Sequence, residues 1–208
     1  SFNNFGWIEN SKYKNFFDVR LGDIRDFDIT KKSCSDCDII LHLAALIGIP
    51  YSFNAPSSYL ETNINGTLNI CEIVKNSKIK KLIITSTSEV YGSAQNIPMT
   101  EEHVLNPQSP YAATKIAADH LAMSYYYSFK LPISILRPFN VYGPRQSDRA
   151  VIPTIINQMM NKNNKFVSLG NIDSRRDYTY VEDLCSAYEI LMNSKNTNGK
   201  IYHTSNNE

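Results

Sequence analysis

The feature that most constrains the fold is a regular alternation of short apolar runs with longer amphipathic stretches. Three runs, at 38–45, 81–85 and 133–136, are largely hydrophobic and rich in isoleucine and leucine. Such runs are typical of strands buried on both faces of a parallel sheet. The stretches at 57–76 and 109–129 lie between them and fit helices. Strands and helices in this order predict right-handed βαβ units, and therefore an α/β fold with a doubly wound parallel sheet.

The pattern changes on either side of this central part. Upstream, the apolar run at 16–21 ends at a Gly-Asp turn and predicts another strand. Past residue 144 we expect a helix at about 151–161, a strand at 166–169, a helix at 182–193 and a final strand near Ile201. We interpret these later elements as a smaller region built over the carboxyl ends of the sheet.

Composition excludes several classes of protein. Of the 208 residues, 42% are hydrophobic and 20% are charged, and the net charge is only +1, which is typical of a soluble globular protein and indicates neither nucleic acid nor a membrane as partner. No apolar stretch approaches the roughly 20 residues of a membrane span, and no signal-peptide pattern opens the chain, so we expect a cytoplasmic protein. The pair Cys34-x-x-Cys37 has no second ligand pair and the four histidines are scattered, so we predict no metal site.

The clearest chemical signal is the pair Tyr111 and Lys115, spaced Y-x-x-x-K. Ser109 suits an N-cap and Pro110 suits the first helical position, so Tyr111 is expected in the first turn of a helix with Lys115 on the same face. The helix dipole and the ammonium group both favour a phenolate, so we expect the pKa of Tyr111 to fall from about 10 toward the working pH. Tyr111 is therefore a candidate general base.

Several short segments, taken together and in order, resemble the extended short-chain dehydrogenase/reductase family, specifically its NAD-dependent nucleotide-sugar epimerases and 4,6-dehydratases. The resemblance covers nearly the whole chain. It rests on GDIR at 22–25, HLAA at 42–45, NINGT at 63–67, STSEVYG at 86–92, YAATK at 111–115, RPFNVYGP at 137–144 and RDY at 176–178. It implies a Rossmann-like fold in which 1–144 form a partial NAD-binding domain with the catalytic helix, and 145–208 form a partial substrate-binding region.

The family's glycine-rich turn, which presents backbone amides to the NAD pyrophosphate, is not found in this chain. Its eight glycines nowhere have that spacing. By analogy with the family, Asp23 and Ile24 follow the third strand, so we expect the chain to be truncated at its N-terminus and its substrate region to be incomplete. We expect these 208 residues alone to bind NAD weakly and to be inactive.

The resemblance also assigns roles to individual residues. The implied catalytic residues are Thr87, Ser88, Glu89, Tyr111 and Lys115. The implied NAD contacts are Asp23, Ile24, Leu43, Ala44, Ala45, Asn63, Tyr111, Lys115 and Pro138, although Asn63 is at least as well explained as a structural amide. The segment 137–140 would border nicotinamide and substrate. The implied substrate contacts are Thr87, Asn140, Arg149 and Arg176, the last as a phosphate-binding arginine.

In the implied mechanism Tyr111 takes the proton of the sugar 4-hydroxyl as C4 is oxidised, Lys115 holds the phenolate and the nicotinamide ribose, and Thr87 hydrogen-bonds the reacting oxygen. Glu89 then distinguishes the reactions. A 4,6-dehydratase needs a carboxylate that removes the C5 proton, whereas a 4-epimerase does not. Ser88 stands where many dehydratases have an acidic residue, so Glu89 would be the base and also a candidate acid.

A 4,6-dehydratase that uses tightly bound NAD, regenerated in each turnover, is therefore the preferred hypothesis. A 4-epimerase and a non-catalytic protein that binds NAD and a sugar nucleotide remain as alternatives. The segments 1–7 and 46–52 resemble the branch that acts on nucleotide-linked N-acetylglucosamine in nonulosonic (legionaminic-type) acid synthesis. The alanine-rich helix at 109–129 implies a homodimer, because that helix often builds one in this family. The nucleotide and the sugar are left open.

Overall fold

The protein is described by a computed structural model that covers residues 5–206. Its centre is a four-stranded, fully parallel sheet in the order β1-β2-β3-β6. The strands are β1 (Ile39–His42), β2 (Lys81–Thr85), β3 (Ile133–Pro138) and β6 (Ile201–Thr204). A separate parallel pair is formed by β4 (Asn140–Tyr142) and β5 (Tyr178–Tyr180). The predicted α/β fold with a Rossmann-like parallel sheet is confirmed.

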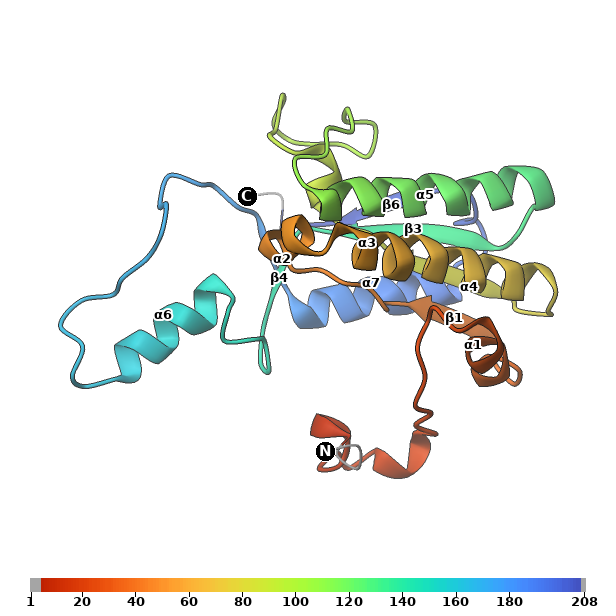
Figure 1. Ribbon diagram of the computed structural model, residues 1–208, viewed down its shortest axis with the longest axis horizontal. Coiled ribbons are helices and arrows are strands. Elements are labelled where there is room, and N and C mark those ends of the chain that lie inside the picture. The colour runs from red at the N-terminus through yellow and green to blue at the C-terminus, as the bar shows by residue number, and fades with distance from the viewer. Residues whose placement is uncertain (1–4, 207–208) are drawn as a thin grey trace.

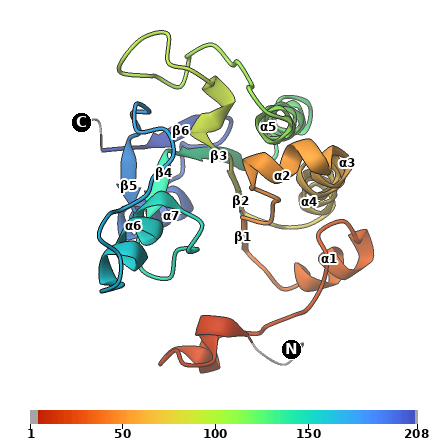
Figure 2. The same ribbon diagram turned by 60° about the vertical axis from the view of Figure 1, so that its left-hand side comes forward.

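Helices cover both faces of the sheet, as Figures 1 and 2 show. On one face α4 (Gly66–Lys75) and α5 (Pro110–Phe129) lie side by side, and on the other lies α7 (Val181–Asn193). The remaining α-helices are α1 (Phe27–Ser33), α2 (Ile49–Asn54), α3 (Pro56–Tyr59) and α6 (Val151–Met160). A π-helical turn, η3 (Leu60–Asn65), joins α3 to α4, and the 3₁₀ turns are η1 (Gly6–Ile8), η2 (Lys14–Phe16) and η4 (Ser88–Tyr91).

The alternation of side chains along the strands explains this layering. Leu82 and Ile84 of β2 pack into a core with α4 and α5, whereas Ile83 points the other way and packs with Tyr188 and Leu191 of α7. All three β2 residues are fully buried. A strand that is buried on both faces needs an uninterrupted apolar sequence, which explains why these runs are largely hydrophobic.

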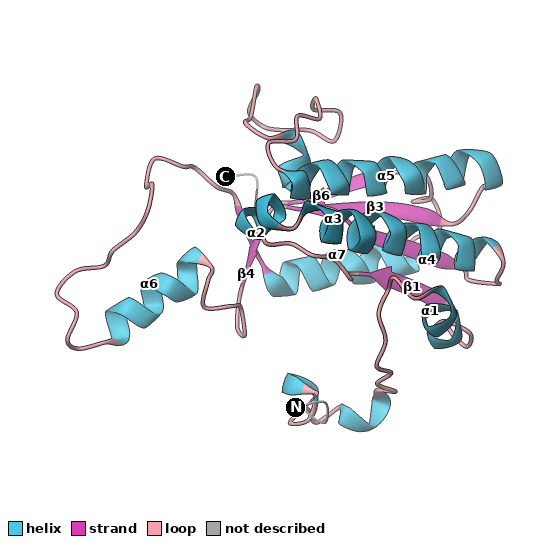
Figure 3. Ribbon diagram, viewed as in Figure 1, coloured by secondary structure: helices cyan, strands magenta, loops and turns pink. Residues whose placement is uncertain are grey.

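Two predicted strands are wrong. The run at 16–21 forms no strand: Phe16 ends the turn η2 and the rest is irregular and unpaired, with Phe16 87% and Leu21 66% exposed. Within residues 5–206 no strand pairs with the outer edge of β1, and a β-strand requires a hydrogen-bonded neighbour. The run at 166–169 is also irregular; Phe166 is exposed, and Ser168 is bound by the side chain of Gln158 instead. Figure 3 shows this stretch as part of the long loop that leads from α6 toward β5.

The later elements do not all lie apart from the sheet. Although β6 and α7 follow residue 144, β6 extends the main sheet beside β3, and α7 covers one of its faces. The division of the chain at 144/145 therefore stays a prediction about its functional halves. Among residues 5–206, no helix combines the length and the apolar character needed to cross a membrane.

Candidate functional site

The candidate catalytic helix begins as its sequence predicts. Ser109 caps α5 by accepting a hydrogen bond from the Ala112 amide at 3.1 Å, and Pro110 occupies the first turn. Tyr111 and Lys115 follow on the face that meets the sheet, 7% and 6% exposed respectively. The Lys115 ammonium donates to the Thr85 carbonyl at 2.5 Å, at the carboxyl end of β2. The helix thus places both side chains where βαβ folds bind their ligands.

The predicted fall in the pKa of Tyr111 is wrong for this structure. Burial raises the pKa of Tyr111 to about 12, and the negative charges of Glu89 and Asp119 act in the same direction. A hydrogen bond with Thr87 lowers this pKa, but by less than burial raises it. The sequence argument counted the helix dipole and the ammonium and did not include desolvation, which favours the neutral phenol. Burial likewise lowers the pKa of Lys115.

Thr87, Ser88 and Glu89 lie directly after β2, in and before the turn η4. Thr87 caps that turn by accepting from the Glu89 amide at 3.2 Å, and all three residues are half-buried. Because Thr87 hydrogen-bonds Tyr111 and the charge of Glu89 acts on the same phenol, the structure brings the three side chains together. Ser88 begins η4 beside them. A hydroxyl and a phenol thus lie together beyond the end of β2, with a carboxylate near enough for its charge to act on the phenol.

The predicted cofactor side lies at the carboxyl end of β1. Leu43 and Ala44 are exposed and Ala45 is half-buried, so they form a small apolar surface that begins one residue past the strand. Asn63 is fully buried and holds the loop that follows: its Oδ1 accepts from the Leu46 amide at 2.8 Å, and its Nδ2 donates to the Leu46 carbonyl at 3.0 Å. The structural role considered for Asn63 is what its contacts show.

The Asn63 amide also reaches helix α5. Its Nδ2 lies 3.0 Å from the Thr114 hydroxyl, which in turn donates to the Tyr111 carbonyl at 2.7 Å. Asn63 belongs to the π-helical turn η3, a feature that is rare in proteins and frequent near functional sites. The loop after β1 and the first turn of α5 are therefore joined through one amide.

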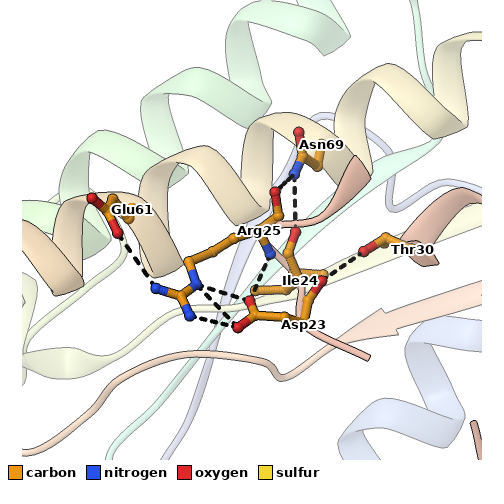
Figure 4. Close-up of polar contacts among 6 residues, drawn as sticks. All are labelled: Asp23, Ile24, Arg25, Thr30, Glu61 and Asn69. Carbon is orange, nitrogen blue, oxygen red and sulfur yellow. Dashed lines mark hydrogen bonds and ion pairs between the residues drawn. The ribbon is translucent and has the colours of Figure 1, made fainter. Parts of the chain in front are cut away.

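The turn that contains Asp23 and Ile24 is hydrogen-bonded to helix α4, as Figure 4 shows. The Asp23 carboxylate accepts from Arg25 at 2.6 Å, and these hydrogen bonds lower the pKa of Asp23 to about 2. Asn69 of α4 donates to the Ile24 and Arg25 carbonyls at 2.9 and 3.1 Å. Ile24 packs against Gly66, where a Cβ atom would lie 2.8 Å from its side chain. The turn is thus held against α4, with the Asp23 side chain 49% exposed.

These residues fit one part of a dinucleotide. A half-exposed carboxylate and an exposed apolar surface suit an adenosine, and a buried tyrosine and lysine suit the reactive ring with its ribose. None of the described glycines has the spacing of a pyrophosphate-binding turn. The fit therefore covers the two ends of NAD and not the phosphates between them. Within residues 5–206, no cluster of three His, Cys, Asp or Glu side chains could hold a metal ion.

The predicted substrate residues lie only partly together. Asn140 and Arg176 line one cavity of about 580 Å³, together with Gln146 and Tyr178, between β4, β5 and the loops around α6. Arg149 does not line it and is exposed on the loop before α6. The structure therefore groups Asn140 with Arg176 and leaves Arg149 outside. Gln146 was missed from the sequence, although it lies only two residues past the RPFNVYGP segment.

The expectation that Arg137 borders the reacting groups is wrong. Arg137 is 2% exposed, and its guanidinium binds the Asp119 carboxylate through Nη2 at 2.9 Å and Nε at 3.0 Å. Pro138 is buried as well, opposite Thr204 of β6. Asp119 was missed from the sequence. It is one turn beyond Lys115, so the extended spacing Y-x-x-x-K-x-x-x-D could have indicated it.

Comparison with known proteins places this geometry in context. The profile of the family described as GDP-mannose 4,6 dehydratase matches residues 1–208. A dTDP-D-glucose 4,6-dehydratase of Dictyostelium discoideum is 41% identical over 177 residues, which are 80% of this chain and 40% of that protein. The chain spans about half the length of the curated relatives it matches.

Solved structures that resemble the chain include epimerases. The UDP-N-acetylglucosamine 4-epimerase from Methanobrevibacter ruminantium M1, in complex with UDP-N-acetylmuramic acid, superposes with a TM-score of 0.87 at 33% identity, covering 98% of this chain and 66% of that one. The UDP-glucuronic acid 4-epimerase from Bacillus cereus, in complex with UDP-glucuronic acid and NAD, gives 0.81 at 33% identity, covering 88% and 58%.

Proposed function

The chain belongs to the NAD-dependent nucleotide-sugar epimerase/dehydratase family of extended short-chain dehydrogenase/reductases, and from this we propose that the protein containing it is a nucleotide-sugar 4,6-dehydratase. One observation supports the dehydratase over other members. The glutamate Glu89 lies at the carboxyl end of β2, close enough for its charge to raise the pKa of Tyr111. The product would be a 4-keto-6-deoxy sugar nucleotide.

The proposed chemistry divides between two bases. Tyr111 takes the proton from the sugar 4-hydroxyl, and Thr87, already hydrogen-bonded to Tyr111, holds the reacting oxygen. NAD, when bound, would accept the hydride of C4 and later return it to C6; C5 then takes up a proton from solvent, and Tyr111 gives up the proton it holds. Lys115, whose ammonium donates to the Thr85 carbonyl in this structure, would hold the nicotinamide ribose and support the phenolate of Tyr111.

Glu89 acts on the neighbouring carbon. Once C4 is a ketone the C5 proton becomes acidic, and a carboxylate beside it removes that proton as the 6-hydroxyl leaves with a proton to form water. Ser88 has no ionisable group, so we assign the acid role to Glu89 as well, which would pass on the proton it has just taken. Asn140 and Arg176 then form the substrate side, with the guanidinium suited to a diphosphate.

A 4-epimerase is the second candidate, because epimerases are among the solved structures that resemble the chain at 33% identity. It would use Tyr111 and Thr87 in the same way, but its reaction does not require a base at C5. The two reactions therefore differ in what happens to the hydrogen on C5. Loss of the C5 hydrogen to solvent is required by the dehydratase and not by the epimerase.

The experiment is to give the whole protein a panel of nucleotide hexoses in deuterated water and to identify the product by NMR. We expect loss of the 6-hydroxyl and incorporation of deuterium at C5, and a roughly 100-fold or greater loss of kcat in Glu89→Gln. Glu102→Gln, an exposed glutamate on the following loop, is the matched control and should retain activity. A C4-inverted product with its 6-hydroxyl intact would show that the protein is an epimerase.

Finer assignments follow from the same proposal. We propose a nucleotide-linked N-acetylglucosamine as the sugar, in the legionaminic-type branch, supported by the likeness to a UDP-N-acetylglucosamine 4-epimerase. Part of the segment that first indicated this branch, residues 1–4, lies outside the described residues. We also propose that the protein is cytoplasmic and forms a homodimer through α5.

A further inference from the structure

The segment from Ser86 to Tyr91 carries both Thr87 and Glu89, and it is held at its two ends by one buried ion pair. At its start, the Ser86 hydroxyl donates to Asp119 Oδ2 at 2.8 Å. At its end, the hydroxyl of Tyr91 accepts from Arg137 Nη1 at 2.7 Å. Asp119 and Arg137 are bound to each other. The two ends of the segment are therefore connected through α5 and β3.

The ion pair is a rigid support. Asp119 is 1% and Arg137 2% exposed, and three donors converge on Asp119 Oδ2: the Ser86 hydroxyl and two guanidinium nitrogens. Removing either partner would leave an uncompensated buried charge, so neither side chain can readily turn away. Both also come from regular elements, α5 and β3, whose backbones are held by their own hydrogen bonds.

The far end of the segment has additional contacts. Tyr91 is fully buried, its hydroxyl lies 2.6 Å from His203 Nε2, and the Arg137 guanidinium lies 5.1 Å from the centre of its ring. His203 belongs to β6. The turn η4 is thus anchored to two neighbouring strands beyond the one it leaves. Between the two anchors, the Glu89 amide bonds to Thr87 inside the segment, and the Val90 carbonyl accepts from the Asn106 amide at 2.9 Å.

We propose that Asp119 and Arg137 are positioning residues, which set the place of Thr87 and Glu89 by holding Ser86 and Tyr91. The inference rests on the proposed function, because it assigns a purpose to the position of two residues that the reaction uses. Neither Asp119 nor Arg137 touches the substrate in this account. Holding a base and a hydrogen-bond donor in the productive geometry contributes strongly to rate, and a misplacement of about 1 Å can cost roughly 100-fold.

The opposing explanation is that the pair only stabilises the core. The variants Ser86→Ala and Tyr91→Phe distinguish the positioning role from this stabilising role. Each removes one hydroxyl from an anchor and leaves the ion pair in place. Ser134→Ala is the matched control. Ser134 is also a fully buried serine with one hydrogen bond, to the Thr197 carbonyl at 2.9 Å, but it pairs with Ile83 and so lies away from the segment 86–91.

The test combines kinetics with amide hydrogen exchange on the whole protein. For Ser86→Ala and Tyr91→Phe we expect kcat to fall by ~10- to 100-fold with KM within about threefold of wild type, and exchange to rise within residues 87–91. In the double variant the losses should be less than multiplicative, because both anchors hold one segment. Ser134→Ala should lower the unfolding temperature without changing kcat.

Each other outcome counts against the inference. Unchanged exchange within 87–91 would show that the pair does not hold the segment, whatever reaction the protein performs. Faster exchange with wild-type kcat would show that the holding has no catalytic role. If wild-type protein inverts C4 instead of dehydrating, the proposed function fails but the inference is still tested, because Thr87 serves both reactions and the same loss of kcat is then measured on the inverted product.

Discussion

The structure predicts a pH dependence of stability that comes from His42, at the end of β1. This side chain is 5% exposed, and its Nε2 lies 3.1 Å from the hydroxyl of Thr67. Thr67 donates its only hydroxyl proton to the Asn63 carbonyl at 2.7 Å, so towards His42 it can only accept. His42 therefore carries a proton on Nε2. Burial first, and then the positive charge of Lys115, lower the pKa of His42 to about 4.

The direction of the effect follows from linkage. Below about pH 6.5 the unfolded chain binds a proton at His42, while the folded protein does not until about pH 4. The stabilisation from neutral His42 is thus fully present above pH 6.5 and is lost as the pH falls toward 4. At about 1.4 kcal/mol for each pKa unit, the difference between 6.5 and 4 corresponds to roughly 3 kcal/mol of unfolding free energy.

The assay is urea unfolding followed by circular dichroism at pH 7 and at about pH 4.5, for wild type and His42→Gln. Glutamine can keep a hydrogen bond to Thr67 but does not titrate, so subtracting its pH profile removes the contribution of all other groups. We expect wild type to lose about 2–3 kcal/mol more than the variant on acidification. Parallel profiles, or an NMR titration of His42 with a midpoint near 6.5, would refute the reasoning.

Two further predictions concern the charged side chains of Lys81 and Arg25. Lys81→Met should lower the free energy of unfolding in urea by about 2–4 kcal/mol, because the buried ammonium donates to Thr197 at 2.5 Å and to Asn198 at 2.9 Å. Replacing the exposed Lys80 by Met should leave the unfolding free energy almost unchanged. Equal effects of the two substitutions would contradict this reasoning. Arg25→Met should raise the pKa of Asp23 from about 2 toward its ordinary value in an NMR titration, and a midpoint that stays near 2 would show that Arg25 is not the cause.

The position of Tyr111, the proposed catalytic tyrosine, could be predicted from the sequence because the signals are local. A capping serine, a proline in the first turn and a lysine four residues on specify a helix start, and the structure has that start at Pro110. The three central strands were recognisable for a similar reason, because burial on both faces demands an unbroken apolar run. These patterns depend on residues within one or two turns of each other.

The failures have one physical cause. The chemistry of Tyr111 and Arg137 depends on groups that are distant in sequence: burial reverses the predicted change in the pKa of Tyr111, and Asp119 turns Arg137 inward. The strand predicted at 16–21 has no partner among the described residues, and pairing decides whether an apolar run becomes a strand.

The sequence by itself thus determined the alternation of strands and helices, the capped helix start and the order of the family segments. Only the tertiary structure decided which side chains meet. Ser86, Asp119 and Arg137 lie on three segments, and their contact exists because β2, β3 and α5 pack together. Periodicity and capping act through the local backbone, whereas desolvation and ion pairing depend on every neighbour in space, so the site became visible only in the folded chain.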